Sequence, residues 1–165
     1  MLKWGTITVR RVGAFAAFFG AIAFSVVFVN WPSISHRRQA ALVPTALRGE
    51  TNKMKLLLSA GANANEPACE GSLCVRPLFA AALCDCPDAV RLLLDNGANV
   101  NGKSKDGQTA LVAAAYEGHA ATVKLLLLRG ADPSVQWEGL TALEWARQQQ
   151  HSEIINLLEN KGAGE

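Results

Sequence analysis

Four cysteines are the side chains with the most evident capacity for chemistry in this sequence: Cys69, Cys74, Cys84 and Cys86. Their spacing, C-x4-C followed by C-D-C, is compatible with a zinc site, because zinc binds tetrahedral sets of thiolate ligands. Pairs of the same residues could instead form disulfides. Which chemistry applies depends on the elements that carry the four cysteines.

The other reactive side chains show no catalytic arrangement. His119 and His151 are 32 residues apart, and the sequence has no Gly-rich phosphate loop, no Ser-His-Asp set and no carboxylate pair at helical spacing. Cys86, Asp88 and His119 are residue types found in nucleophilic sites, but nothing in the sequence orients them. We therefore predict that the chain is not an enzyme and needs no cofactor or small-molecule substrate.

The elements that carry these residues follow a repeating pattern. Residues 109–132, TALVAAAYEGHAATVKLLLLRGAD, predict an alanine-rich helix, a Gly-His turn and a leucine-rich helix. Gly-Ala turns like the one that closes this segment begin at Gly61, Gly97, Gly130 and Gly162, with spacings of 36, 33 and 32 residues. A period near 33 indicates stacked supersecondary units.

This segment resembles one ankyrin repeat, whose pattern is T-P-L-H-x-A-A-x-x-G-H followed by V-x-L-L-L-x-x-G-A-D. The matching residues are Thr109, Leu111, Ala114, Ala115, Gly118, His119, Val123, Leu125, Leu126, Leu127, Gly130, Ala131 and Asp132. The resemblance implies an all-α solenoid of helix-turn-helix pairs with hairpin loops. It covers four repeats, at about residues 40–71, 72–106, 107–138 and 139–163. The first and last repeats are expected to act as caps.

The resemblance also places the cysteines. Cys69 and Cys74 fall on an enlarged hairpin tip, whereas Cys84 and Cys86 fall beyond the next helix, roughly 15 Å away and too far for one tetrahedral site. We therefore predict no metal site. Cys69 and Cys74 are suitably spaced for a disulfide, with two free thiols as the alternative. One residue between Cys84 and Cys86 is a strained spacing for a bridge, and the resemblance implies a structural role for both histidines.

Residues 12–29 contain no charged side chain, and as a helix they would span roughly 27 Å, close to the thickness of a hydrocarbon core. We predict a transmembrane or signal-anchor helix over 12–31, after a basic tail at 1–11 and before a linker at 32–39. The basic tail favours a cytoplasmic N-terminus, with the repeats on the periplasmic or extracytoplasmic side. A signal peptide, cleaved to leave a mature N-terminus near His36, is the alternative.

The charge of the repeats argues against nucleic-acid binding. Five of the 16 basic residues precede residue 39, and all 14 acidic residues follow it, which leaves the repeats with a net charge of −3. A mildly acidic domain is a poor match for a phosphate backbone. We therefore expect a protein partner whose identity the sequence does not give.

The candidate partner-binding residues lie on loop tips and on the first helices of the repeats: Trp137, Trp145, Tyr116, Lys103, Lys105, Asp106 and Glu138. Register with Ala113 also predicts a concave row formed by Pro44, Ala80, Ala113 and Trp145. We predict a membrane-anchored scaffold that mediates protein–protein interaction. The alternatives are a secreted or periplasmic repeat protein released by signal cleavage, and a Cys-based redox or metal-binding protein.

Overall fold

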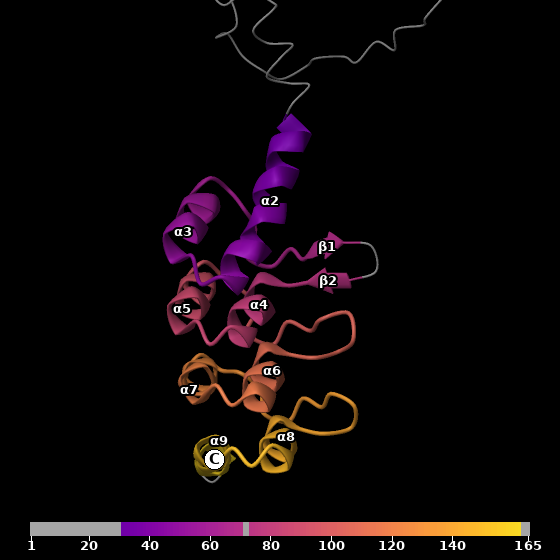
Figure 1. Cartoon of the computed structure of the whole chain (residues 1–165), viewed down its shortest axis with the longest axis vertical. Helices are drawn as coiled ribbons and strands as arrows, with labels where there is room; N and C mark the ends of the chain where they lie inside the picture. The colour runs from indigo at the N-terminus through magenta and orange to yellow at the C-terminus, as the bar shows by residue number, and fades with distance from the viewer. Residues whose placement is uncertain (1–30, 71–72, 163–165) are drawn as a thin grey trace, which may run out of the picture. The chain divides into compact units, whose positions relative to one another are not determined.

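The computed structural model describes residues 31–70 and 73–162 (Figure 1). The helices in chain order are α2 (Trp31–Leu47), α3 (Thr51–Ser59), α4 (Pro77–Leu83), α5 (Pro87–Asp95), α6 (Ala110–Glu117), α7 (Ala120–Leu128), α8 (Ala142–Gln148) and α9 (Ser152–Gly162). Two short strands, β1 (Ala68–Glu70) and β2 (Leu73–Val75), pair antiparallel between α3 and α4. These elements are the helix pairs and the hairpin that the sequence period predicts.

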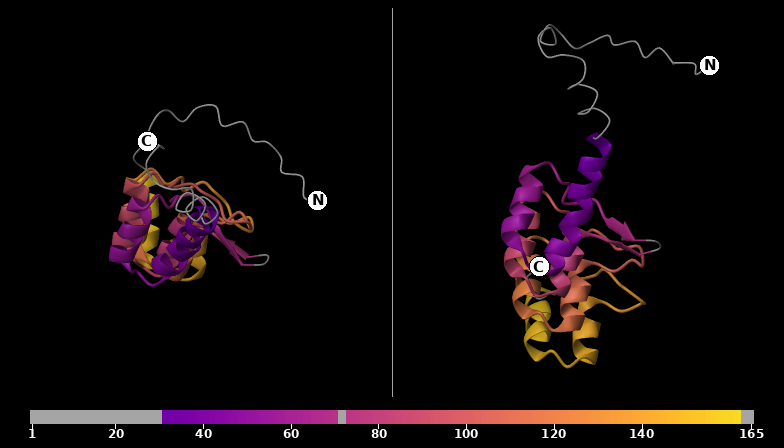
Figure 2. Two further views of the ribbon diagram at one scale, coloured as in Figure 1. Left: turned by 90° about the horizontal axis from the view of Figure 1, so that it is seen from above. Right: turned by 45° about the horizontal axis from the view of Figure 1, so that its top comes forward.

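The helices form two columns, with α2, α4, α6 and α8 in the inner column and α3, α5, α7 and α9 in the outer column (Figure 1). Helix α6 packs against both α4 and α8, while α7 packs against α5 and α9. The hairpin and the loops before α6 and α8 project from the inner column on the same side (Figure 2). We call this the loop side of the repeats.

The first described helix begins earlier than the sequence suggests. Helix α2 starts at Trp31, so residues 32–39, predicted to be a linker, belong to the helix. Pro32 lies in its first turn, where a missing backbone N–H breaks no helical hydrogen bond. The next proline, Pro44, lies near the other end, so nothing between the two prolines interrupts the helix.

The predicted transmembrane segment falls outside the described residues, except for Trp31. Among the helices that the structure does describe, none is both long enough and apolar enough to cross a bilayer. Membrane anchoring therefore stays a prediction from the sequence.

Leucines of the outer column and alanines of the inner column make up the core. Leu93 and Leu126 are fully buried, and the alanines of α4 and α6 let the inner helices approach closely. Ala80 and Ala113 have exposed fractions of 0%, so the predicted concave row of Pro44, Ala80, Ala113 and Trp145 is wrong at its centre. These two small side chains are packed inside the stack, where they form no surface.

Threonine side chains begin the later inner helices, as the repeat pattern predicts. Thr109 caps α6 by accepting a hydrogen bond from the backbone N–H of Val112, and Thr141 forms a capping box with Glu144 on α8. Arg76 makes no cap at α4. Its guanidinium instead donates to the carbonyls of Asn65 and Lys103, at 2.6 and 2.9 Å, and so connects the base of the hairpin to the next loop.

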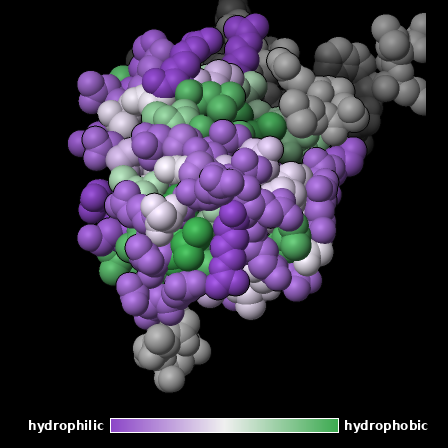
Figure 3. Space-filling model, turned by 60° about the horizontal axis from the view of Figure 1, so that its bottom comes forward, coloured by the Kyte–Doolittle hydropathy of each residue, from purple (hydrophilic) through white to green (hydrophobic). Residues whose placement is uncertain are grey.

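The C-terminal end of the stack is mainly hydrophilic, with small separate hydrophobic areas (Figure 3). This end is formed by α8 and α9, whose outward residues include Arg147 and Glu159, an ion pair at 2.7 Å. A polar end face is what a solenoid needs where no further repeat covers it.

Candidate protein-interaction surface

Three aromatic side chains meet on the loop side of the last two repeats. Tyr116 comes from the end of α6, Trp137 from the loop before α8, and Trp145 from α8 itself. The ring centroids of Trp137 and Trp145 are 5.0 Å apart, and that of Tyr116 lies 6.4 and 5.3 Å from them. We call these three residues the aromatic cluster.

A tight turn and one side-chain hydrogen bond position the cluster. Trp137 and Leu140 exchange backbone hydrogen bonds of 2.9 and 3.0 Å around Glu138 and Gly139, which both have positive φ angles (52° and 80°). Positive φ at both central residues defines the type I′ turn of two-residue hairpins. The indole N–H of Trp145 donates to the backbone carbonyl of Trp137 at 3.3 Å, which holds the loop against α8.

The cluster is only partly covered by the rest of the chain. Tyr116 keeps 37% of its surface exposed, and both tryptophans are half-buried. Trp137 therefore packs within its own loop and also keeps part of its surface exposed. Tryptophan and tyrosine with this combination of rigidity and exposure are common anchors in protein interfaces.

The charged residues predicted for the same surface lie around two loops. Lys103, Lys105 and Asp106 are exposed on the loop before α6, whereas Glu138 is exposed beside Trp137 on the next loop. Hydrogen bonds from the side chain and backbone of Ser134 lower the pKa of Asp132, and the positive charge of Lys103 adds a smaller effect. A role of these four residues in binding stays a prediction.

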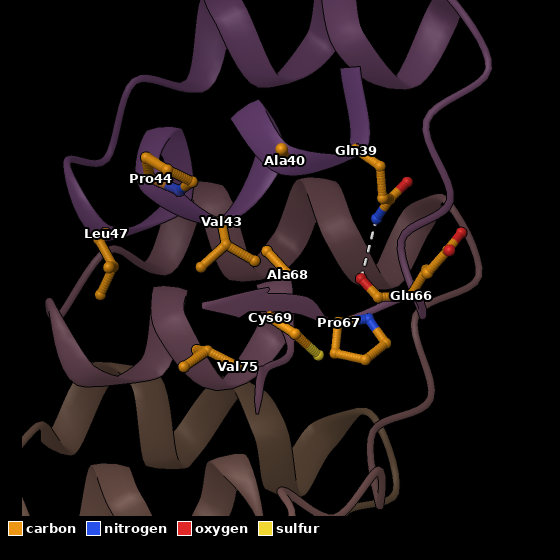
Figure 4. Close-up of a pocket in the computed structure, with 10 residues that line it drawn as sticks. All are labelled: Gln39, Ala40, Val43, Pro44, Leu47, Glu66, Pro67, Ala68, Cys69 and Val75. Atoms are coloured by element: carbon orange, nitrogen blue, oxygen red, sulfur yellow. Dashed lines mark hydrogen bonds between the residues drawn. The ribbon is translucent and has the colours of Figure 1, made fainter. Parts of the chain in front are cut away.

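A groove on the loop side of the first two repeats was not predicted. It has a volume of about 520 Å³ and is lined by Gln39, Ala40, Val43, Pro44, Leu47, Glu66, Pro67, Ala68, Cys69 and Val75 (Figure 4). Most of these side chains are apolar. One wall is α2 and the other is the hairpin with the segment that leads into it (Figure 4).

Gln39 holds the two walls of the groove in place. Its side-chain amide donates to the carbonyls of Asn63 and Glu66 at 2.9 and 2.8 Å, and its carbonyl oxygen accepts from the backbone N–H of Asn63 at 2.8 Å. The apolar spacing of Ala40, Val43 and Leu47 was a signal for a helical wall. The groove itself was not predicted, because its second wall comes from the hairpin, a later segment of the chain.

The hairpin wall carries the first pair of cysteines. Cys69 and Cys74 are opposite each other in the strand register and are joined by a disulfide, with their Cα atoms 4.0 Å apart. The cross-link closes the tip of the hairpin and places Cys69 in the lining of the groove. A covalent tie here fixes the hairpin in one strand register.

Cys84 and Cys86 are also paired in the structure, contrary to the expectation from their spacing. The reason is the backbone of Asp85, whose φ angle of 49° turns the chain so that both side chains lie on the same side. The sulfur of Cys84 lies 3.2 Å from the carbonyl oxygen of Ala46, so this turn contacts the first repeat. No group of three potential metal ligands occurs within the described part of the chain.

His119 and His151 each connect successive inner helices. The Nε2–H groups of His119 and His151 lie 3.1 and 3.0 Å from the carbonyl oxygens of Leu83 and Tyr116, to which they donate. The carboxylate nearest His119 belongs to Asp85, with 3.9 Å between Nδ1 and Oδ2. The structure therefore gives the histidines the structural role implied by the repeat pattern.

Comparison with known protein families agrees with this architecture. A family model described as ankyrin repeats (3 copies) matches residues 78–164. Protein HOS4 of Saccharomyces cerevisiae is 40% identical over 96 residues, and the E3 ubiquitin-protein ligase XBAT33 of Arabidopsis thaliana is 35% identical over 119 residues. The serine/threonine-protein kinase TNNI3K of Mus musculus is 36% identical over 84 residues.

These matches cover 54%, 71% and 44% of this chain but only 9%, 23% and 10% of the three relatives. The similarity therefore concerns the repeats and does not extend to the ligase or kinase activity that two of the names state. Ankyrin repeats generally bind protein partners. The repeat period, the helix pairs and the family match together show that this chain belongs to the ankyrin-repeat family.

Proposed function

We propose that this chain is a scaffold that binds another protein on the loop side of its repeats and is tethered to a membrane by residues 12–31. The observation that carries the proposal is the groove between α2 and the hairpin. Its volume of about 520 Å³ lies within the usual range for binding pockets, and its lining is mostly apolar. The aromatic cluster adds a second exposed anchor on the same side.

The side chains of the groove favour a partner that inserts apolar residues. Leu47 is 45% exposed at its edge, while Val43 forms a buried part of the α2 wall. A partner side chain that fills the groove would bury apolar surface on both walls, at roughly 25 cal/mol for each Å² removed from water. No catalytic group is required for this role.

The cysteine pairs support a location of the repeats outside the cytoplasm. Disulfides persist in oxidising compartments and are rare in the cytosol. One pair closes the hairpin between the first two repeats, the other lies in the second repeat, and the basic N-terminal tail favours the same topology. A tether in this orientation would confine the scaffold to the outer surface of the membrane and raise its local concentration there. Release by signal cleavage is the alternative.

Site-specific photo-crosslinking in intact cells would test the docking surface. A photoreactive amino acid at Leu47, on the edge of the groove, is expected to form a discrete cross-linked product. The matched control is Leu128 on α7, which is 75% exposed on the outer column. Filling the groove with Ala40→Trp should remove the product at Leu47. Equal products at Leu47 and Leu128, or a product at Leu47 that survives Ala40→Trp, would contradict the proposal.

The same experiment can test the tether. Fractionation of the cross-linked cells should recover the full-length chain with the membranes. A shortened chain in the soluble fraction would instead support the cleaved form.

A further inference from the structure

The ring faces of the aromatic cluster can attract positive charge, and apolar docking alone does not use this property. We infer that it binds a cationic side chain, Arg or Lys, of the protein partner. The inference rests on the proposed function in that the cation belongs to a protein. It adds the chemical class of the residue that is recognised.

The rings supply the first part of such a site. The faces of aromatic rings are negative in their quadrupole, and tryptophan attracts a cation most strongly. Trp137 and Trp145 lie at a tilt of 34°, and Tyr116 stands nearly perpendicular to both, at 90° and 75°. Because all three side chains keep exposed surface, a cation can approach the cluster from solvent.

Carboxylates supply the second part. Each ring has an exposed glutamate as its neighbour in the chain: Glu117 follows Tyr116, Glu138 follows Trp137, and Glu144 precedes Trp145. The three glutamates belong to different elements. Each Cα atom is one peptide unit, about 3.8 Å, from the Cα atom of an aromatic residue. Each of the three segments that carry the rings therefore also carries an exposed carboxylate.

Glu144 forms no ion pair within the described residues, although the positive charge of Arg147 acts on it. Glu144 accepts hydrogen bonds of 2.7 and 2.8 Å from the backbone N–H and hydroxyl of Thr141, which hold the pKa of its carboxyl below the ordinary value. Glu144 is therefore charged at neutral pH. Arg147, one turn further along α8, is paired with Glu159 at 2.7 Å.

The remaining two carboxylates are available. Within residues 31–70 and 73–162, Glu117 and Glu138 take part in no ion pair. A partner Arg or Lys that reaches the cluster would find exposed carboxylates without an ion pair in the same segments as the rings.

Trp137 and Trp145 are partly buried against the core, while smaller side chains fill the inward positions of the fourth repeat. Ala142 and Ala146 have exposed fractions of 0% and fill the inward positions of α8, and Ile154 and Leu158 fill those of α9. Replacing Trp137 with leucine should preserve apolar packing in the loop while removing the π face. This variant separates a cation-binding role from a purely structural one.

The test uses the full-length chain in detergent micelles and blocked peptides Gly-Arg-Gly-Arg-Gly, with citrulline in place of arginine as the neutral control of equal shape. The indole N–H resonances of Trp137 and Trp145 report binding at the cluster. We expect saturable shifts with the arginine peptide, and an affinity about five-fold lower for the citrulline peptide.

Two variants and a control test the residues. Trp137→Leu should abolish the shift of the Trp145 resonance, and the double variant Glu117→Gln/Glu138→Gln should weaken binding about five-fold with less dependence on salt. Glu153→Gln on α9, where Glu153 is exposed in the first turn, should leave the affinity unchanged.

Equal affinity for both peptides, or arginine binding that leaves the two indole resonances in place, would overturn the inference. Its failure is distinguishable from that of the proposed function. If cross-linking at Leu47 succeeds but the cluster does not distinguish arginine from citrulline, the scaffold remains and the cation site is wrong. If the peptide binds but Leu47 gives no cross-link, the docking groove is wrong and the cation site stands.

Discussion

The side-chain oxygen of Asn65 accepts a hydrogen bond of 2.6 Å from the backbone N–H of Asn99, 34 residues further along the chain. The amide nitrogen of the same Asn65 donates to the carbonyl of Gly97 at 2.7 Å. Asn101 repeats the arrangement one unit later, with bonds to Asp132 and Gly130 of 2.9 and 3.5 Å. One asparagine in each loop thus connects its repeat to the turn that ends the next outer helix.

Replacing Asn65 by alanine should loosen the junction between the first two repeats. Loss of two hydrogen bonds at a partly solvated site should cost about 1–2 kcal/mol. The amide of Asn99 should then exchange with solvent roughly ten-fold faster, as measured by amide hydrogen exchange. Asn52→Ala, at an exposed position on α3, is the control and should not change this rate. An unchanged exchange rate of the Asn99 amide would show that its hydrogen bond to Asn65 does not stabilise the junction.

The Gly118→Ala substitution should destabilise the folded chain more than an alanine substitution at another glycine with a similar positive φ angle. Gly118 has a φ angle of 86°, and an added Cβ would lie 2.7 Å from a ring carbon of His151. Gly107 has nearly the same φ, 84°, but open space around it. The backbone conformation should cost about 1 kcal/mol at both positions.

The difference between the two variants isolates the contact with His151. Thermal unfolding should give a lower Tm for Gly118→Ala than for Gly107→Ala, and His151→Ala should recover part of the loss in the Gly118→Ala background. If the two glycine variants have the same Tm, the close approach of the imidazole is not a constraint.

The start of α8 should lose stability at acid pH. Hydrogen bonds from Thr141 lower the pKa of Glu144 from its ordinary value of 4.5. A carboxyl whose pKa is lower in the folded state contributes stability above its unfolded pKa and loses it as the pH falls through the folded pKa. The Tm of the parent chain should therefore fall more steeply below pH 4.5 than that of Glu144→Gln. Parallel pH profiles would contradict this.

The cysteines should react with a thiol reagent only after reduction. A membrane-impermeant maleimide added to intact cells should label the chain after a reductant and not before, because both pairs are bonded and the proposed topology places the repeats outside. Labelling only after permeabilisation, without reduction, would place the repeats in the cytoplasm. Cys69→Ser/Cys74→Ser and Cys84→Ser/Cys86→Ser report each pair separately.

The disulfide of the hairpin should also stabilise one wall of the groove. Closing a loop of five positions removes about 2 kcal/mol of chain entropy from the unfolded hairpin. The Cys69→Ser/Cys74→Ser variant should therefore show faster hydrogen exchange at β1 and β2 and weaker cross-linking from Leu47. Exchange unchanged at both strands would mean that the strand pairing alone fixes this wall.

The repeats could be predicted because their signals are local. The threonine caps at Thr109 and Thr141, the Gly-Ala turns and the leucine runs each determine structure within a few residues, and their period sets the stacking. The start of α2 was missed because Pro32 resembles a helix break, whereas a proline in the first turn is compatible with a helix. The groove was not predicted because it forms between α2 and the hairpin, and the sequence does not give their distance in space.

The features of the candidate surface that escaped prediction depend on backbone conformation. The positive φ of Asp85 brings Cys84 and Cys86 together. The sequence does not indicate a positive φ at this position, because Asp85 is not a glycine. The bonds of Arg76 to two loops depend on the distance between these loops in space, which the sequence does not give. Tyr116, Trp137 and Trp145 were each singled out from the sequence, while their mutual packing follows from the type I′ turn at Glu138.

The equivalence of Asn65 and Asn101 makes the repeats interchangeable along the stack. Excision of residues 99–131, one period of 33 residues, would bring Asn65 opposite Asp132, the partner that Asn101 has in the intact chain. The same excision would bring His151 opposite Leu83, which now accepts from His119. The number of repeats therefore sets the distance between the groove and the residues near the C-terminus, while the hydrogen bonds between neighbouring repeats stay the same.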